Sequence, residues 1–371
     1  MIDGKLFRIY PDKNQQTLLL QWIGHQRFIY NAKVAEDRYF RTFKRKSPAL
    51  VGEPIPVDQQ YSHFITEQTQ FLKEVPSQIL RNGAYKWITA QQRFVKKVAK
   101  GRPTFQNKYG RQSVMITMEL FIFSSLTPQT AVISLGTKKH PVGAIKINTH
   151  KTSIPYEVPN MVAISIYAGK WYLSFNHETE APIFSEAELL SALQHLDETQ
   201  LAEITTGFDR NVVIPVAGSN GVNFDYSLQQ KKNAAKALKG KKKWQQRHVR
   251  RQKSSANQRK ATKKIARYDG AIANIRKDFC HQTSHKIVAS PGNLLVFEAL
   301  NIKNMTASAR GTVDKPGKNV NQKAGLNRSI LNSGWGKVIE FTRYKALRRG
   351  KLVIEVRANY SSQDKPCCCC S

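Results

Sequence analysis

The sequence predicts an α/β fold in two parts, a β-rich module that carries helices and a second part built on a mixed sheet. Apolar and polar residues alternate with a period of two in runs such as 162–166 and 171–175, which is typical of half-buried strands. After residue 204, short apolar strands alternate with long helical segments, a pattern that favours a mixed α/β sheet. Between the two parts no Lys or Arg occurs from Trp171 to Asp209. This change of charge predicts a domain boundary near residue 200.

The first domain is expected over residues 1–182. An apolar strand near residues 6–10 is followed by a helix that begins at Pro11, and the helical insertion then extends over about residues 12–100. From residue 114 to residue 175, Pro and Gly separate several short strands. Such a series of short strands indicates a small barrel.

An acidic linker is expected over residues 183–203, with one short helix. Ser185 and Glu188 have the spacing of a capping box, in which each side chain accepts a bond from the other residue's backbone. The second domain then covers residues 204–371 and opens with a β-rich stretch. In that stretch Asn220-Gly221 lies between alternating apolar residues, which predicts a β-hairpin.

The rest of the second domain is predicted to combine short strands with long helices. Residues 294–298 and 352–356 have the pattern of buried strands, and residues 326–349 that of a helix. A basic helical insert is expected over about residues 228–290. Its first part, residues 228–268, holds 16 Lys or Arg and no acid, and Ala, Lys, Arg and Gln are good helix formers.

The composition restricts the classes of function. The chain has 371 residues, with 59 Lys and Arg against 26 Asp and Glu, a net charge of +33 and a pI near 10.1. This balance argues against a typical small-metabolite enzyme, and a hydrophobic content of 40% argues against a disordered basic tail. A folded chain this basic predicts a polyanionic partner, most often nucleic acid. A charge that serves solubility alone is the alternative, and +33 on one chain exceeds that need.

The sequence also predicts the compartment. No apolar run reaches the roughly 18 residues that a membrane helix requires, and the N-terminus lacks the pattern of a secretory signal. The cysteines are Cys280 and the consecutive Cys367 to Cys370, which do not form a disulfide framework. We therefore expect a protein of the reducing cytoplasm without a membrane partner.

The basic run of the second domain is expected to contact a phosphate backbone. Charges of one sign repel each other, so a nearby polyanion explains such a run better than a solvated helix face does. Trp244 can stack on a base, although packing is the commoner role of a tryptophan. The candidate nucleic-acid-binding residues are Lys241, Lys242, Lys243, Trp244, Arg250, Arg251, Lys263, Lys264 and Arg328.

Two of the scarce acids in the second half lie in apolar strands. Asp209 lies in the first strand of that half, and Glu298 ends a strand almost ninety residues later. Two carboxylates side by side on adjacent strands would need cations, and Mg²⁺ prefers oxygen ligands. The alternative from spacing alone is that Asp209 caps a turn and Glu298 pairs with a surface lysine.

Several motifs carry a family resemblance that covers nearly the whole chain. Gly207-Phe208-Asp209-Arg210-Asn211 resembles a first RuvC-like motif, and the run from Val296 to Met305 resembles a second. The stretch from Gly325 to Gly336 matches the segment that follows and is the most specific of the three. Arg27-Phe28-Ile29-Tyr30-Asn31 resembles an N-terminal helical signature, and the basic run ending at Phe279 resembles a helical insert. Through these motifs the sequence resembles the TnpB family of transposon-encoded RNA-guided nucleases. This family is related to type V CRISPR effectors, and its members were long labelled OrfB-type transposases.

The resemblance implies a fold, a site and partners. The fold would be an RNase H-like (RuvC-like) nuclease domain preceded by a wedge-type β-barrel with an inserted helical bundle. Asp209 and Glu298 would be catalytic ligands of a two-ion Mg²⁺ site. A transposon-derived guide RNA would pair with double-stranded target DNA, while the protein holds the heteroduplex by its backbone. The protein would lie in the cytoplasm of a prokaryotic cell, associated with the nucleoid when bound to DNA.

The end of the sequence departs from the family pattern. After Gln363 the family continues into a zinc ribbon with two Cys-x-x-Cys pairs and then a third catalytic Asp. Here four consecutive cysteines follow, and they cannot easily surround one tetrahedral ion. We expect an incomplete zinc-ribbon start over residues 361–371, truncated or frameshifted, with Cys367 and Cys370 as the candidate Zn²⁺ ligands. A weak, adventitious metal-binding tail is the alternative.

This departure predicts impaired catalysis. Two acids can hold one Mg²⁺ but would not fix a second, so DNA cleavage is expected to be poor or lost. The alternatives are a non-catalytic protein that binds DNA through its guide RNA, and a defunct transposon fragment that folds poorly. Strand-transfer chemistry is not predicted, because neither a transposase-type catalytic Tyr nor a separate acid triad stands out.

Overall fold

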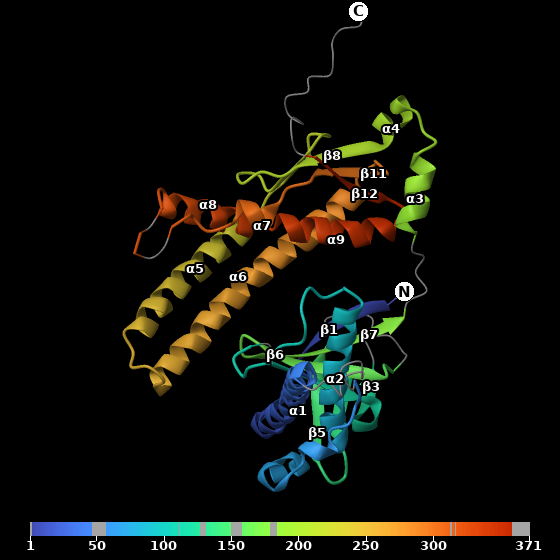
Figure 1. Ribbon diagram of the computed structural model, residues 1–371. Helices are drawn as coiled ribbons and strands as arrows, with labels where there is room; N and C mark the ends of the chain where they lie inside the picture. Colours follow the sequence, from blue (N-terminus) through green and yellow to red (C-terminus); the bar gives the residue numbers. More distant parts are fainter. Residues whose placement is uncertain are drawn as a thin grey trace, which may run out of the picture. The chain divides into compact units, whose positions relative to one another are not determined.

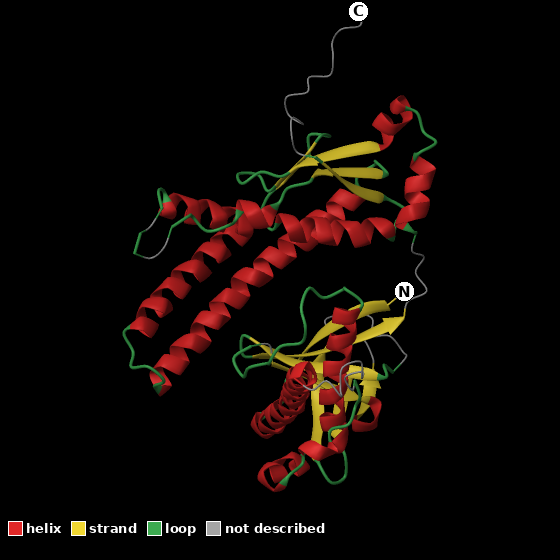
Figure 2. Cartoon of the chain, viewed as in Figure 1, coloured by secondary structure: helices red, strands yellow, loops and turns green. Residues whose placement is uncertain are grey.

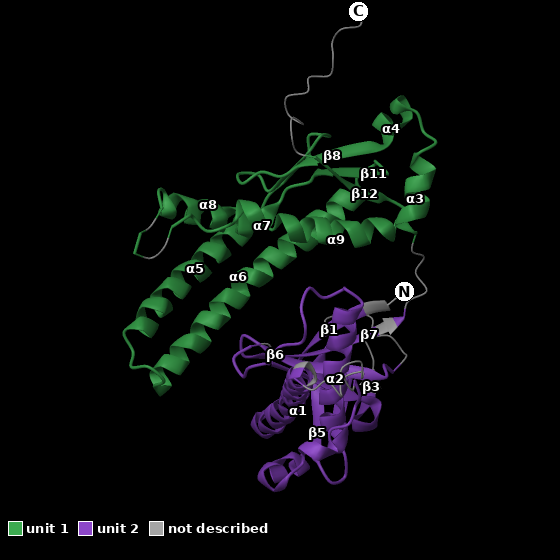
Figure 3. Cartoon of the chain, in the orientation of Figure 1, with its two compact units in different colours: residues 1, 180–371 green, residues 2–179 purple. Residues whose placement is uncertain are grey.

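Figure 1 shows the computed structural model, which describes residues 2–46, 57–110, 112–126, 131–149, 158–178, 184–311, 314–315 and 317–357. The chain divides into two compact units, an N-terminal unit of residues 2–179 and a C-terminal unit of residues 180–371 (Figure 3). The finer domain boundaries that the sequence suggests at residues 182 and 203 stay predictions.

The N-terminal unit contains a seven-stranded antiparallel sheet in the order β2-β6-β7-β1-β5-β4-β3. Its strands are β1 (Ile2–Ile9), β2 (Gln112–Thr117), β3 (Phe121–Leu126), β4 (Ala131–Gly136), β5 (Pro141–Asn148), β6 (Met161–Tyr167) and β7 (Lys170–Glu178). Among the residues described, the edge strands β2 and β3 do not pair, so the closed barrel expected from the sequence is not seen. Within the described residues the sheet is open, and α1 and α2 contact β2.

Helices cover one face of this sheet. They are α1 (Lys13–Lys46), η2 (Ser62–Phe64), η3 (Glu67–Glu74), α2 (Ser77–Val95) and η4 (Met118–Leu120). The first helix begins with a reciprocal cap, in which Gln15 N donates to Asp12 Oδ1 at 2.8 Å and Asp12 N donates to Gln15 Oε1 at 3.0 Å. Trp22 of α1 and Ile79 of α2 pack with Ile164 and other alternate strand residues in one core. The period-two pattern of the sequence thus marks the buried face of the sheet.

The C-terminal unit contains a five-stranded sheet in the order β10-β9-β8-β11-β12. Its strands are β8 (Thr205–Asp209), β9 (Val216–Gly218), β10 (Asn223–Phe224), β11 (Leu294–Glu298) and β12 (Leu352–Val356). β8, β9 and β10 pair antiparallel, and the turn of the β9–β10 hairpin contains Asn220-Gly221, as the sequence predicts. β11 lies between β8 and β12 and runs parallel to both. The unit is therefore a mixed α/β fold.

Two long helices, α5 (Leu228–Val249) and α6 (Ala256–Ala289), form a hairpin between β10 and β11. They lie side by side over much of their length (Figure 1). Ser227 caps α5 in a capping box with Gln230, and the Ser255 side chain accepts from Gln258 N at the start of α6. The last part of α6 packs with α9 (Trp335–Leu347) on one face of the sheet, as Figure 2 shows.

The segment predicted as one helix over residues 326–349 consists of two helices, α8 (Val320–Ser333) and α9. Gly334 separates them in a left-handed conformation with φ +74°. A Cβ at this position would lie 2.8 Å from Cys280 Sγ, so glycine is required both by the backbone and by the close packing of α6. The helix therefore breaks where the sequence has its Gly-Trp-Gly run.

Shorter elements complete the C-terminal unit. The predicted acidic linker folds into two helices instead of one, α3 (Glu186–Leu193) and α4 (Glu198–Ile204), while α7 (Ile302–Met305) follows β11. The expected capping box at Ser185 forms, and Phe184 N donates to Leu347 O at 3.3 Å. No helix among the residues described is long and apolar enough to cross a membrane.

Candidate carboxylate site and nucleic-acid interface

Asp209 and Glu298 are the last residues of neighbouring parallel strands, β8 and β11. The register of these strands pairs Leu294 with Thr205 and continues to Phe297 and Phe208. The two acids are the next residues along each strand. Because neighbouring strands lie about 4.8 Å apart, the two backbones bring the carboxylates to one edge of the sheet.

The two acids also share a face of the sheet. The rings of Phe208 and Phe297 stack at 5.1 Å in the core beneath α6 and α9. Successive side chains of a strand point to opposite faces, so Asp209 and Glu298 both point away from that core. Asp209 is exposed and Glu298 is half-buried. The structure thus brings together the two acids that the sequence singled out.

Arg210, which sequence reasoning missed, connects the ends of these strands. It is only 5% exposed, and its Nη2 donates a hydrogen bond to the main-chain oxygen of Glu298. Burial lowers the pKa of the guanidinium, while the carboxylates of Glu355, Glu298 and Asp209 act in the opposite direction. Its Nε has no hydrogen-bond partner. The position of Arg210 directly after Asp209, a predicted metal ligand, was the signal in the sequence that could have identified it.

Glu355 is a second acid that the sequence analysis did not single out. It lies in β12 opposite Phe297, and Arg343 of α9 donates to its Oε1 at 3.0 Å. Both residues line a cavity of about 430 Å³ together with Arg210. Because its strand partner Phe297 faces the core, Glu355 belongs to the helix-covered face and not to the face of Asp209 and Glu298.

The donor atoms at this edge fit Mg²⁺. Asp209 and Glu298 offer hard carboxylate oxygens, which Mg²⁺ prefers, and both approach from rigid strand ends. No group of three or more His, Cys, Asp or Glu that could hold a metal ion occurs among the residues described. A metal ion at this edge would therefore have Asp209 and Glu298 as its carboxylate ligands from the described residues.

Among the described residues, the cysteine does not offer a metal ligand. The zinc-ligand candidates Cys367 and Cys370 lie outside the described residues. Cys280 is buried, and burial raises the pKa of its thiol to about 11. A thiol protonated at neutral pH is a poor ligand for Zn²⁺, which binds thiolate.

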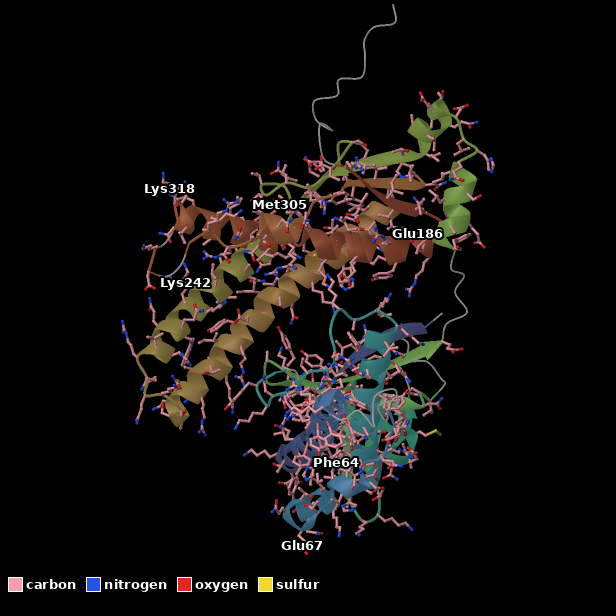
Figure 4. The ribbon with its side chains drawn as sticks, in the orientation of Figure 1. Phe64, Glu67, Glu186, Lys242, Met305 and Lys318 are labelled. Atoms are coloured by element: carbon pink, nitrogen blue, oxygen red, sulfur yellow. The ribbon has the colours of Figure 1, made fainter. Side chains whose placement is uncertain are left out.

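The basic hairpin of α5 and α6 carries most of the predicted nucleic-acid-binding residues. Lys242, which Figure 4 labels, and Lys243 are exposed on α5. Lys263 on α6 and the turn residues Arg250 and Arg251 are exposed too. Lys241 is different, because its Nζ lies 2.6 Å from the Oδ1 of Asp269 on α6. The hairpin therefore presents a long cationic surface with few acids to offset it.

Trp244 lies between cations of both hairpin helices. The guanidinium carbon of Arg247 is 4.8 Å from the ring centroid, and Lys264 Nζ is 6.0 Å from it. The side chain is half-buried. Arg247 and Lys264 thus cover part of the Trp244 ring, and the part that stays exposed can stack on a base.

Lys241 and Arg328 line one cavity, although they are 87 positions apart in the chain. The cavity has about 550 Å³ and lies between α5, α6, α8 and the loop after β8. Apolar side chains such as Leu238 and Ile272 line it, and cations surround them. This cavity thus brings together predicted site residues from α5 and α8.

Comparison with known proteins finds two family models and relatives of similar sequence. A family model described as "Probable transposase" matches residues 211–309, and one described as "Helix-turn-helix domain" matches residues 1–39. "Putative RNA-guided DNA endonuclease InsQ" of Escherichia coli (strain K12) is 28% identical over 367 residues, which are 96% of this chain and 81% of the relative. A "Putative RNA-guided DNA endonuclease" of Streptomyces pristinaespiralis is 26% identical over 361 residues, 94% of this chain and 76% of the relative.

A solved structure agrees in fold. The protein in the cryo-EM structure of a Cas12f1–sgRNA–target DNA complex matches with a TM-score of 0.52 and 10% identity, over 97% of this chain and 90% of that chain. The chain belongs to the TnpB family. In this TnpB protein, Glu298 lies inside the segment matched as a transposase, and Asp209 lies two residues before it. The segment matched as helix-turn-helix consists of β1 and most of the single helix α1.

Proposed function

We propose that this TnpB protein is an RNA-guided, Mg²⁺-dependent DNA endonuclease of a mobile element, with impaired cleavage because two carboxylates would not fix a second metal ion. The observation that carries the proposal is the placement of Asp209 and Glu298 on one face, at the ends of adjacent parallel strands. Three antiparallel strands joined to two parallel ones support an RNase H-like (RuvC-like) assignment of the C-terminal unit. The names of the relatives, which are RNA-guided DNA endonucleases, support the activity.

In this proposal Asp209 and Glu298 hold the metal ion. Bound Mg²⁺ would stabilise negative charge on a phosphodiester and make a nucleophile from water. Arg210 fixes the end of β11 through the main-chain oxygen of Glu298, so its role is to position that carboxylate. Since α6 and α9 cover the opposite face, a DNA strand would approach the face away from these helices.

The basic hairpin of α5 and α6 would bind the guide RNA and its heteroduplex with target DNA. Exposed lysines such as Lys242 and Lys243 suit contacts to phosphates, which carry no sequence information. Sequence selection would come from base pairing between a transposon-derived guide RNA and double-stranded target DNA. The Cas12f1 structure, a complex with guide RNA and target DNA, supports this partner set.

The second candidate is a non-catalytic protein that binds DNA through its guide RNA. The observation in its favour is that the described residues contain no group of three or more potential metal ligands. Two carboxylates hold an ion less firmly than three and leave more of its coordination to water. Both candidates share the same RNA and DNA partners, so only a cleavage measurement separates them.

The test is cleavage of matched DNA by the full chain purified with its co-expressed guide RNA. We expect weak Mg²⁺-dependent cleavage that Asp209→Asn and Glu298→Gln each reduce further, by at least about 100-fold, because each removes a carboxylate that holds the metal ion. Glu340→Gln is the matched control, since Glu340 is an exposed acid paired with Lys337. Guide-dependent binding without cleavage would support the second candidate, and a chain that retains no RNA would contradict both.

A further inference from the structure

The last turns of α1 carry three large aromatic side chains that remain exposed. Tyr39 is 65% exposed, Phe43 is 46% exposed and Phe40 is 36% exposed. Tyr39 and Phe43 are four residues apart, so one turn of the helix brings them to the same side. Their ring centroids are 6.1 Å apart and their planes differ by 8°, which makes them a stacked pair. This pair therefore presents a continuous aromatic surface to solvent.

Packing among the described residues of the N-terminal unit does not account for these rings. The main core of the unit includes α1 residues such as Leu19 and Ile29. A smaller buried cluster joins α1 to α2, and Val34 is the last α1 residue in it. None of residues 38–43 is buried. A single exposed aromatic residue needs no explanation, but here Phe40 also contacts Tyr39 edge-on at 6.0 Å, so the three rings form one patch.

The charge around the patch indicates what would bind it. Residues 38–46 read Arg-Tyr-Phe-Arg-Thr-Phe-Lys-Arg-Lys, with basic and aromatic residues interleaved. The neighbouring acid Asp37 is buried and paired with Arg41 at 2.9 Å, so it does not offset the remaining cations. Arg38 lies with its guanidinium carbon 4.3 Å from the Phe105 centroid, which adds a further exposed ring beside the helix. An apolar protein surface would leave these cations unpaired, whereas a polyanion with flat bases satisfies both features.

We infer that the stacked pair Tyr39–Phe43 is a platform on which an unpaired base of single-stranded RNA stacks, with its phosphates near the basic residues of the same turns. The inference rests on the proposed function, which makes guide RNA a partner of this chain. It adds a site in the N-terminal unit, far in sequence from the basic hairpin. Stacking accepts every base, so this platform would hold the RNA without reading its sequence.

The test uses the full chain stripped of bound RNA and a fluorescent single-stranded RNA without self-complementarity. Replacing both rings in the double variant Tyr39→Ala/Phe43→Ala is expected to lower the RNA affinity by about 10- to 100-fold, since removal of a stacked ring costs roughly that factor. Tyr39→Phe keeps the ring and should bind as the wild type does. Tyr109→Ala is the control, because Tyr109 is an exposed tyrosine of the same unit outside the patch, and it should change the affinity little.

The dependence on salt separates stacking from charge. Alanine at Tyr39 and Phe43 removes no cation, so the slope of log affinity against log salt should stay that of the wild type while the affinity falls. Affinity for fully duplex RNA should be unchanged, because paired bases offer no free face. Unaltered binding of single-stranded RNA by the double variant, or a loss confined to single-stranded DNA, would overturn the inference.

Three outcomes are decisive. A wild-type dimer that becomes a monomer in the double variant, measured by sedimentation, would show that the patch joins two copies and would overturn the inference. Absence of RNA binding by the wild-type chain would overturn the proposed function as well. Normal wild-type binding with an unaffected double variant would overturn the inference alone. Because the rings are exposed, thermal unfolding of the variants should match the wild type and show that the fold is intact.

Discussion

Arg210 donates a hydrogen bond from Nη2 to the main-chain oxygen of Glu298, a residue 88 positions later in the chain. The bond joins the end of β8 to the end of β11, which are the two strand ends that carry Asp209 and Glu298. A buried guanidinium is costly unless it is hydrogen-bonded and near negative charge, and here the carboxylates of Glu355, Glu298 and Asp209 favour its charged form. The carboxylate edge therefore depends on a side chain that is not itself a proposed ligand.

Replacing Arg210 by methionine should destabilise the C-terminal unit. Arg210→Met keeps most of the side-chain volume but leaves the oxygen of Glu298 without its charged donor, at a cost of about 1.5–3 kcal/mol. Urea unfolding measures the change. Arg251→Met is the control, since Arg251 is exposed in the hairpin turn and should change stability by less than about 0.5 kcal/mol. Equal stability of the two variants would show that the strand ends do not depend on Arg210.

Two glycines of the α8–α9 segment should respond to alanine in opposite directions. At Gly334 the φ of +74° costs an L-residue about 1–2 kcal/mol, and the new Cβ would lie 2.8 Å from Cys280 Sγ. At Gly325, inside α8, a Cβ meets nothing within 4 Å, so Gly325→Ala should stabilise the helix by roughly 0.5–1 kcal/mol. Thermal unfolding of both variants checks the pair, and a stable Gly334→Ala protein would contradict the required break.

Local signals in the sequence account for much of the fold. The capping box at Ser185 forms, the Asn220-Gly221 turn closes a hairpin, and Asp209 and Glu298 end neighbouring strands. Each of these depends on a few adjacent residues or on the alternation of a strand, so the sequence displays it directly. The parallel pairing of β8 with β11 is compatible with the long helical connection that parallel strands need.

Features that depend on distant contacts were beyond the sequence. The break at Gly334 depends on Cys280 of α6, and the burial of Arg210 depends on α9 and on β12. The N-terminal sheet is a further case, because its short strands indicated a barrel whereas β2 and β3 do not pair among the described residues. In each case two segments far apart in the chain decide the outcome, and neither shows it alone.

The stability of the C-terminal unit should decrease as the pH falls below about 6.5, the ordinary pKa of a histidine. Burial lowers the pKa of His281, Lys345 and Lys277 lower it further, and Asp278 raises it. The ring stacks on Phe341 at 4.1 Å. The unfolded chain thus binds the proton more readily than the folded one, so this stability is present above pH 6.5 and is lost as the pH falls through the lowered pKa.

The measurement is the urea midpoint as a function of pH for the wild type, for His281→Gln and for His285→Gln. His281→Gln should flatten the acid side of the profile because it removes the titrating ring. His285 is exposed one turn further along α6, so His285→Gln should keep the wild-type profile. A profile of His281→Gln that runs parallel to the wild type would assign the acid sensitivity to other groups.

The lysines of α5 should differ in their contribution to RNA binding although they are adjacent in sequence. Lys242 and Lys243 are exposed, whereas Lys241 Nζ lies 2.6 Å from Asp269 Oδ1. A lysine that neutralises one phosphate of a single strand contributes about 0.7 to the slope of log affinity against log salt. Lys242→Ala and Lys243→Ala should each lower the affinity and reduce the slope by about that amount. Lys241→Ala should change both less, because Asp269 already compensates the charge of Lys241. Titrations of labelled guide RNA at several salt concentrations measure the slopes, and an equal loss in all three variants would mean that the ion pair with Asp269 opens when RNA binds.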